Sequence, residues 1–189
     1  MNGLAHIDRS RHPIDDASYA STLRSQLDRD GLTVLRGFLS DDAVAAVLDE
    51  SLRREHKAFF TTDTHNVYLT PPDAALGDTH IFNRRISSSK GCLADDQVGS
   101  HSPLRAVYTD AAFTGFLCDL LGVAELYPYA DTVSSINVHF HRDGQELGWH
   151  FDNSEFAVTL LIRAPEAGGV FEYVPDVRDA EAGELAFDR

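Results

Sequence analysis

Residues 147–162 read LGWHFDNSEFAVTLLI, and this stretch decides which fold the sequence favours. A polar pair, His150 and Asp152, comes just before an apolar run that is rich in strand-forming residues. In an extended chain, side chains two positions apart point to the same face. The spacing therefore predicts that the His150 imidazole and the Asp152 carboxylate meet, while Phe151 packs on the other face.

An imidazole and a carboxylate on one strand face supply two ligands of the 2-His-1-carboxylate triad. That triad binds Fe(II) and leaves coordination positions open. A bare His-x-Asp triplet is a weak signal, because short patterns match by chance. The alternative interpretation is a surface histidine, His150, that is hydrogen-bonded to Asp152. The sequence around the triplet is needed to choose between a metal site and a hydrogen-bonded surface pair.

Alternation with period two begins near residue 133. Such alternation is typical of a half-buried strand, and its polar face carries Ser135, Asn137, His139 and His141. Further strands are predicted at 156–162 and 170–174, separated by a glycine-containing turn. Several short strands joined by such turns favour an antiparallel sandwich or jelly roll.

The first part of the chain predicts helices. Asp15 or Asp16 can cap a helix that ends near Gly31, and Ser40 can cap the next one. Two further helices are expected after Ser102-Pro103 and over 111–121, and short strands over 32–35, 65–70 and 79–86, followed by a loop at 87–91. We therefore expect an α+β protein in one domain, 1–189. Its helix-rich part is 1–126, and 127–189 is the first part of a jelly-roll (double-stranded β-helix) core.

Composition limits the classes of partner. Of 189 residues, 43% are hydrophobic, which suffices for one domain with a core. The formal charge of −14 argues against nucleic-acid and anionic-membrane surfaces, since both require a basic face. Two cysteines make neither a disulfide framework nor a thiolate metal site. We expect a cytoplasmic protein with a small-molecule substrate, and the sequence leaves the oligomeric state open.

Three runs of sequence resemble a known family: GWHFD at 148–152, EFAVTLL at 155–161 and PEAGGVFEYVP at 165–175. They resemble the Fe(II)/2-oxoglutarate-dependent oxygenases. Within these, the resemblance is to the branch of the free-amino-acid (lysine-type) radical halogenases and related hydroxylases. The runs HNVYL at 65–69 and NRR at 83–85 are similar to the same branch. The resemblance covers roughly residues 30 to 175.

The resemblance implies a jelly-roll core that holds Fe(II) and 2-oxoglutarate and oxidises an unactivated C–H bond. His150 and Asp152 match two metal ligands of the family. In the halogenases the carboxylate position is Gly or Ala, which leaves room for chloride on the iron. The carboxylate of Asp152 fills that room here. The resemblance therefore implies a dioxygenase that hydroxylates a free amino acid or similar small molecule, with halogenation disfavoured.

The resemblance also suggests residues that bind substrate and cofactor. Arg84 or Arg85 matches the stretch that binds the substrate carboxylate, although either can equally form a structural salt bridge. Asn153 occupies the position where the lysine-type enzymes carry an acidic residue near the substrate amine. Cofactor or substrate contacts are expected from the polar strand face, at Asn137, His139 and His141. The two histidines can instead be structural, and either could stand in as a metal ligand.

One departure from the family pattern concerns the third ligand. The family has a second histidine far downstream, followed by a basic residue for the distal carboxylate of 2-oxoglutarate, and no histidine follows His150 here. We therefore expect a jelly roll that is incomplete at its C-terminus, either as a fragment or as a truncated relative. The competing hypothesis is a non-catalytic jelly-roll binding module derived from such an enzyme.

Overall fold

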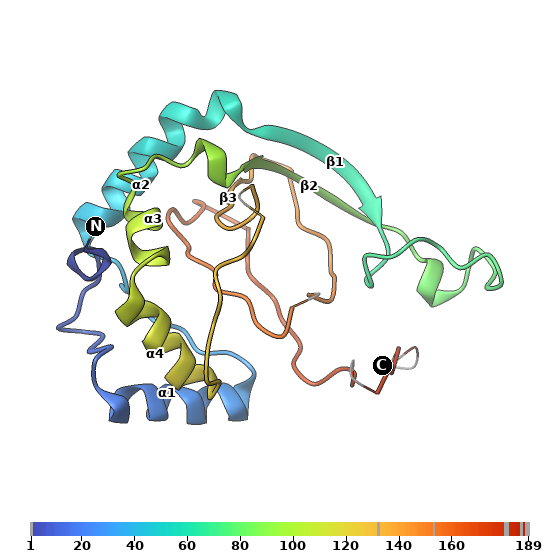
Figure 1. Cartoon of the computed structure of the whole chain (residues 1–189). Coiled ribbons are helices and arrows are strands. Elements are labelled where there is room, and N and C mark those ends of the chain that lie inside the picture. Colours follow the sequence, from blue (N-terminus) through green and yellow to red (C-terminus); the bar gives the residue numbers. More distant parts are fainter. Residues whose placement is uncertain (1, 132, 153, 180–181, 186, 188–189) are drawn as a thin grey trace. The chain divides into compact units, whose positions relative to one another are not determined.

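The computed structural model describes residues 2–131, 133–152, 154–179, 182–185 and 187 (Figure 1). The chain divides into two compact units. Unit 1 comprises Met1–Lys57 and Leu93–Val138, and unit 2 comprises Ala58–Cys92 and His139–Arg189.

Unit 1 is helical. Its α-helices are α1 (Ala17–Asp30), α2 (Asp41–Arg54), α3 (Pro103–Tyr108) and α4 (Ala111–Leu121). Its short 3₁₀ helices are η1 (Gly3–His6), η2 (Glu55–Lys57) and η4 (Asp95–Gln97). Helix α1 packs along α4, and α3 contacts both α2 and η1 (Figure 1).

The predicted helix boundaries are confirmed, because local capping sets them. The Asp16 carboxylate accepts a hydrogen bond from the backbone N–H of Ser18 at the start of α1. Ser40 does the same for α2, accepting from Ala43. Helices α1 and α4 end at Gly31 and Gly122, whose φ angles of 69° and 70° lie in the left-handed region. Only glycine adopts that region without a steric cost.

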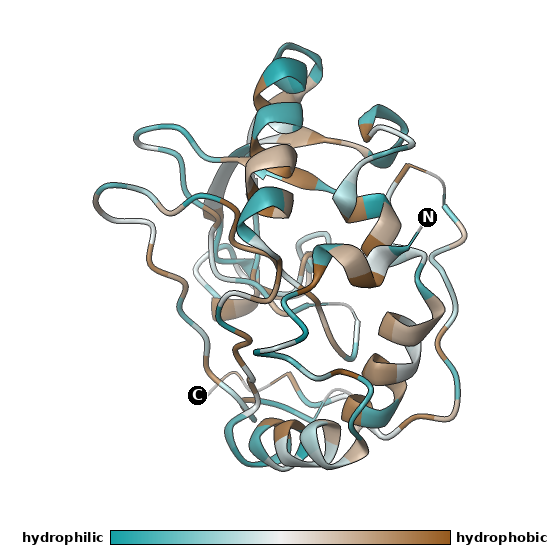
Figure 2. Ribbon diagram, turned by 90° about the vertical axis from the view of Figure 1, so that its left-hand side faces the viewer, coloured by the Kyte–Doolittle hydropathy of each residue, from teal (hydrophilic) through white to brown (hydrophobic). Residues whose placement is uncertain are grey.

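Most buried apolar side chains belong to unit 1. Figure 2 shows the reason, since its helices carry hydrophobic and hydrophilic stretches in turn. Apolar residues at helical spacing form one stripe on each helix and bury it against a neighbour. The most deeply buried side chains of this core include Val47, Leu93 and Phe116.

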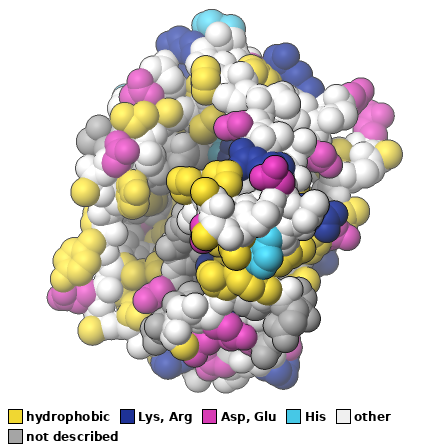
Figure 3. Space-filling model, turned by 90° about the vertical axis from the view of Figure 1, so that its right-hand side faces the viewer, with side chains coloured by type: hydrophobic (Ala, Val, Ile, Leu, Met, Phe, Trp, Pro, Cys, Tyr) yellow, Lys and Arg dark blue, Asp and Glu magenta, His cyan; other side chains and the backbone are white. Residues whose placement is uncertain are grey.

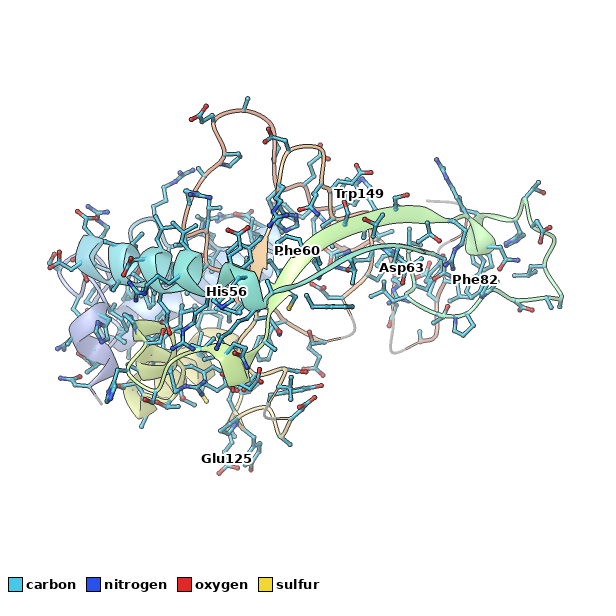
Figure 4. The ribbon with its side chains drawn as sticks, turned by 90° about the horizontal axis from the view of Figure 1, so that it is seen from above. His56, Phe60, Asp63, Phe82, Glu125 and Trp149 are labelled. Atoms are coloured by element: carbon cyan, nitrogen blue, oxygen red, sulfur yellow. The ribbon has the colours of Figure 1, made fainter. Side chains whose placement is uncertain are left out.

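Unit 2 is built on a β-hairpin. Strand β1 (Phe59–His65) pairs antiparallel with β2 (Ile86–Leu93), and Phe59 lies opposite Cys92. Strand β3 (Val138–Phe140) completes a sheet in the order β1-β2-β3. The connection between β1 and β2 contains η3 (Ile81–Asn83). In Figure 4, Phe60 and Asp63 mark β1, and Phe82 lies at the far end of the hairpin.

Several strand predictions in the middle of the chain are wrong. Residues 32–35 and 66–70 form no strand, 79–85 contain a 3₁₀ helix, and the predicted loop at 87–91 is part of β2. The serine-rich run is extended because β1 pairs with all of it. Pairing with a neighbouring strand therefore outweighed the weak local propensity of serine and lysine.

The C-terminal strand predictions also differ from the structure. Only residues 138–140 of the predicted 133–141 strand are in a sheet. Within the described parts of 141–187 the chain has no strand, including 156–162 and 170–174. The described chain contains helices and a three-stranded sheet. The jelly-roll topology and the predicted division at residue 126 stay predictions.

Candidate functional site

His150 and Asp152 lie together in unit 2. The His150 Nε2 atom is 3.4 Å from Asp152 Oδ1. The histidine side chain is about a quarter exposed and the aspartate is largely exposed. The juxtaposition expected from the two-residue spacing is therefore present, although the described residues on either side of the pair belong to no β-sheet.

The hydrogen bond on the other ring nitrogen fixes the proton of His150. Its Nδ1 is 2.9 Å from the carbonyl oxygen of Gly148, and a carbonyl only accepts, so Nδ1 carries the proton. In the neutral ring Nε2 then presents a lone pair toward the Asp152 carboxylate. A lone pair and a carboxylate oxygen side by side are an arrangement that a bound metal ion can use.

The backbone that carries the pair is anchored to the hairpin through Ser88. The Ser88 Oγ accepts a hydrogen bond from the Gly148 N–H at 2.8 Å and lies 2.7 Å from His65 Nε2. The other ring nitrogen of His65 is 2.9 Å from the carbonyl of Asn66 and therefore donates. The Ser88 hydroxyl is thus left to donate to His65 Nε2, and every polar group in this chain of contacts is paired.

Gly148 permits this close approach. A Cβ atom at position 148 would lie 2.5 Å from Ile86 Cγ2 and 2.6 Å from the carbonyl oxygen of Ser87. Real Cβ contacts are longer, so a side chain there would push the 148–152 segment away from β2. The glycine of the GWHFD run therefore has a packing role next to the pair.

The donor set fits part of an iron site. One imidazole nitrogen and one carboxylate oxygen face each other, as two ligands of a facial triad would. Among the described residues, no group of three His, Cys, Asp or Glu side chains is placed to hold a metal. The nearby His65 ring makes an edge-to-face contact with His150, with centroids 6.2 Å apart, but both of its nitrogens are engaged elsewhere.

The two predicted substrate arginines lie after η3, at the start of β2. The Arg85 guanidinium donates to the backbone carbonyl and hydroxyl of Thr64, so it fastens the end of the hairpin. Arg84 is exposed. The buried residue of the NRR run is Asn83, whose amide donates to the carbonyls of Asp73 and Leu76. Asn83 therefore has a structural role in the loop before β2.

The three residues of the predicted polar strand face, Asn137, His139 and His141, have different contacts. The Asn137 amide donates to the carbonyl of Ser134 at 3.0 Å. His139 and His141 are in edge contact, with centroids 6.3 Å apart. His139 is an exposed residue of β3, and its pKa is lowered to about 4 by partial desolvation together with the charges of Lys90 and His141. His139 is therefore neutral at pH 7. Asn153, the last predicted site residue, lies outside the described residues.

A pocket in unit 2 was not predicted from the sequence. It has a volume of about 660 Å³ and is bounded by Tyr68, Pro72, Phe82 and Arg178, among others. Its cation and its aromatic walls are far apart in the chain. The one local signal was the aromatic and proline content of 68–72, which by itself indicates packing as readily as binding.

These features define a mixed α/β protein whose unit 2 presents a His-x-Asp pair of metal-ligand type. The model of the halogenase D family (HalD) matches residues 15–184, and the chain belongs to this family. The match indicates an enzyme of halogenase type. Comparisons with curated proteins and with solved structures gave no match. In the part of the chain that the structure describes, no helix is long and apolar enough to cross a membrane.

Proposed function

We propose that this chain is a cytoplasmic Fe(II)/2-oxoglutarate-dependent oxygenase that hydroxylates a free amino acid or similar small molecule, with iron held by His150 and Asp152. The observation that carries the proposal is the His150–Asp152 pair. Its imidazole is held with Nδ1 protonated, and its Nε2 atom is 3.4 Å from a carboxylate oxygen of Asp152. Membership of the halogenase D family adds support, since it indicates an enzyme of halogenase type.

Each residue around the pair has a defined task in this proposal. The Gly148 carbonyl holds the His150 ring in one tautomer, and such outer partners commonly orient metal-binding histidines. Asp152 supplies the carboxylate ligand. Of the two arginines, Arg84 is the better candidate for a substrate carboxylate, because the Arg85 guanidinium is occupied by Thr64. The iron and 2-oxoglutarate, when bound, supply the oxidising chemistry.

The carboxylate at position 152 favours hydroxylation over halogenation within this proposal. A halide needs a free coordination position beside the metal, and a bound carboxylate takes that position. The jelly-roll topology belongs to the same proposal, because the family resemblance implies it.

Catalysis can be tested by following succinate. The chain is loaded anaerobically with Fe(II), mixed with 2-oxoglutarate and a panel of free and carrier-bound amino acids, and exposed to air. We expect succinate release that requires 2-oxoglutarate and that His150→Ala abolishes. His56→Ala, in the exposed η2 helix, is the matched control and should keep the parent rate.

Iron binding, measured separately, makes a negative result informative. If the chain binds Fe(II) through His150 and yet releases no succinate with any member of the panel, the hydroxylase proposal fails and a non-catalytic binding module remains. With a substrate in hand, Asp152→Gly in added chloride should yield some chlorinated product. Halogenation by the parent chain would contradict the assigned role of Asp152.

A further inference from the structure

We propose that the pocket between Tyr68, Phe82 and Arg178 binds a small-molecule carboxylate with an apolar body. The pocket has a volume of about 660 Å³, which is within the usual range for small-molecule sites. The inference goes beyond the proposed function, because it uses no metal and no residue of the His150–Asp152 pair.

The lining of the pocket is largely apolar, and its polar members are Thr70, Asp73 and Arg178. The rings of Tyr68 and Phe82 are stacked, with centroids 5.0 Å apart and planes 21° from parallel. Pro71 and Pro72 form another part of the lining. Tyr68 is 7% exposed, and its hydroxyl donates to the carbonyl of Leu185. Its polar end is therefore satisfied, and the ring offers only apolar surface to an occupant.

One cation lines the pocket. The Arg178 guanidinium lies 4.1 Å from the centroid of Phe151 and 5.7 Å from that of Tyr68. Stacking on aromatic faces leaves the in-plane N–H groups of a guanidinium free to donate, and a carboxylate accepts two of them side by side. Among the described residues, no carboxylate forms an ion pair with Arg178. A carboxylate ligand would supply that partner.

Two residues with strained backbone are close in sequence to residues that line the pocket. Among the described residues, Leu69 and Asp176 are the non-glycine residues with positive φ, at 56° and 54°. Leu69 adjoins Tyr68, and Asp176 precedes Arg178 by two positions. Strain of this kind persists only where surrounding contacts enforce it, and it is concentrated at binding sites.

The fully buried Asn66 enforces the first strained turn. Asn66 is 0% exposed, its side-chain oxygen accepts from the N–H of Thr70 at 3.0 Å, and its carbonyl accepts from the N–H of Leu69 at 3.1 Å. The Asp73 carboxylate at the rim is engaged as well, accepting from the N–H of Ala75 at 2.8 Å. The loop is therefore set before any ligand arrives.

The test uses the metal-free chain and ligand-observed NMR titrations with four probes. Phenylacetate carries a carboxylate on an apolar body, 2-phenylethanol lacks the charge, succinate lacks the apolar body, and phenylalanine carries an added ammonium. We expect phenylacetate to bind with a Kd on the order of 1 mM, and 2-phenylethanol and succinate to bind at least ~10-fold more weakly. The affinity of phenylalanine, compared with that of phenylacetate, shows whether an added ammonium group on the ligand is tolerated.

Variants assign any binding to this pocket. Arg178→Ala should lose phenylacetate binding by at least ~10-fold, and Arg178→Lys should recover part of it, since charge remains without the planar fork. Arg163→Ala removes an exposed arginine from the same C-terminal region and should bind as the parent does. Equal binding of phenylacetate and 2-phenylethanol by the parent chain would overturn the proposal even if Arg178→Ala failed to fold. Unchanged binding by a folded Arg178→Ala would overturn it too.

Discussion

The orientation of His150 depends on contacts made by Ser88, which is a long way from it in the sequence. Ser88 holds Gly148 through the backbone N–H, and the Gly148 carbonyl in turn accepts the Nδ1 proton of His150. Two-residue spacing was enough to predict that His150 and Asp152 meet. It could not predict Ser88 or His65, because their position depends on the pairing of β1 with β2.

Removal of the Ser88 hydroxyl should therefore weaken metal binding without touching a ligand. Ser88→Ala leaves the Gly148 N–H and His65 Nε2 without partners. We expect Fe(II) affinity to fall by about 10-fold, the lower end of the range for groups that orient metal ligands. Ser87→Ala removes a hydroxyl from an exposed side chain next to it and should change nothing. Equal losses in both variants would argue against a positioning role.

The lowered pKa of His139 in β3 predicts how the stability of the chain depends on pH. Because its pKa is lowered from 6.5 to about 4 in the folded chain, the unfolded chain binds the proton more readily between these values. Stability is therefore lost as the pH falls through this window. The melting temperature of the parent should drop more between pH 7 and pH 5 than that of His139→Gln. Because His141 also has a lowered pKa, part of the acid effect should remain.

The matched control for that experiment is His56→Gln in η2. It should keep the full pH dependence of the parent chain. An identical pH dependence in His139→Gln and in the parent would show that the pKa of His139 is not lowered in the folded chain.

At the scale of elements, the helices could be predicted, whereas of the three strands only β3 lies inside a predicted strand. Asp16, Ser40 and the two C-terminal glycines act within one turn of the backbone they cap, so the sequence carries the whole signal. The serine-rich β2 carries almost none. Its extended shape is a consequence of pairing with β1, which spans 59–65 in a part of the chain where the sequence suggested no strand.

The cap of α2 yields a stability prediction. Ser40 Oγ accepts from the Ala43 N–H at 3.3 Å, and Asp41 and Asp42 lie in the first turn. Ser40→Ala should cost about 1 kcal/mol, or roughly 2–4 °C of melting temperature for a chain of this size. Ser21→Ala, at an exposed position inside α1, should be neutral or slightly stabilising. A Ser40→Ala chain as stable as the parent would show that this contact is not formed.

For the molecule as a whole, apolar surface is distributed unevenly between the units. The buried core belongs mostly to unit 1, whereas Leu161, Val170 and Phe171 of unit 2 are 77%, 80% and 72% exposed. Hydrophobic side chains are visible at the surface in Figure 3. The sequence predicted strands at 156–162 and 170–174, which contain these residues. Their side chains are of the type found in strands. Such side chains become buried only where the strand pairs and its face packs against other residues.

Net charge gives a prediction at the same scale. A formal charge of −14 destabilises the folded chain by self-repulsion, and salt screens it, since the Debye length falls from about 30 Å at 0.01 M to about 10 Å at 0.1 M. The melting temperature should rise by roughly 2–4 °C between these NaCl concentrations at pH 7. Near the sequence pI of about 4.8 the rise should vanish. A melting temperature that falls with salt at pH 7 would contradict this account.

The central claim is that His150 and Asp152 bind iron, and an anaerobic Fe(II) titration by equilibrium dialysis tests it most directly. The parent chain should bind one Fe(II), and His150→Gln and Asp152→Asn should each weaken binding by at least ~10-fold, because the first removes the imidazole nitrogen and the second removes the charge of the carboxylate. His56→Gln should bind as the parent does. Equal affinity in all four chains would contradict the claim.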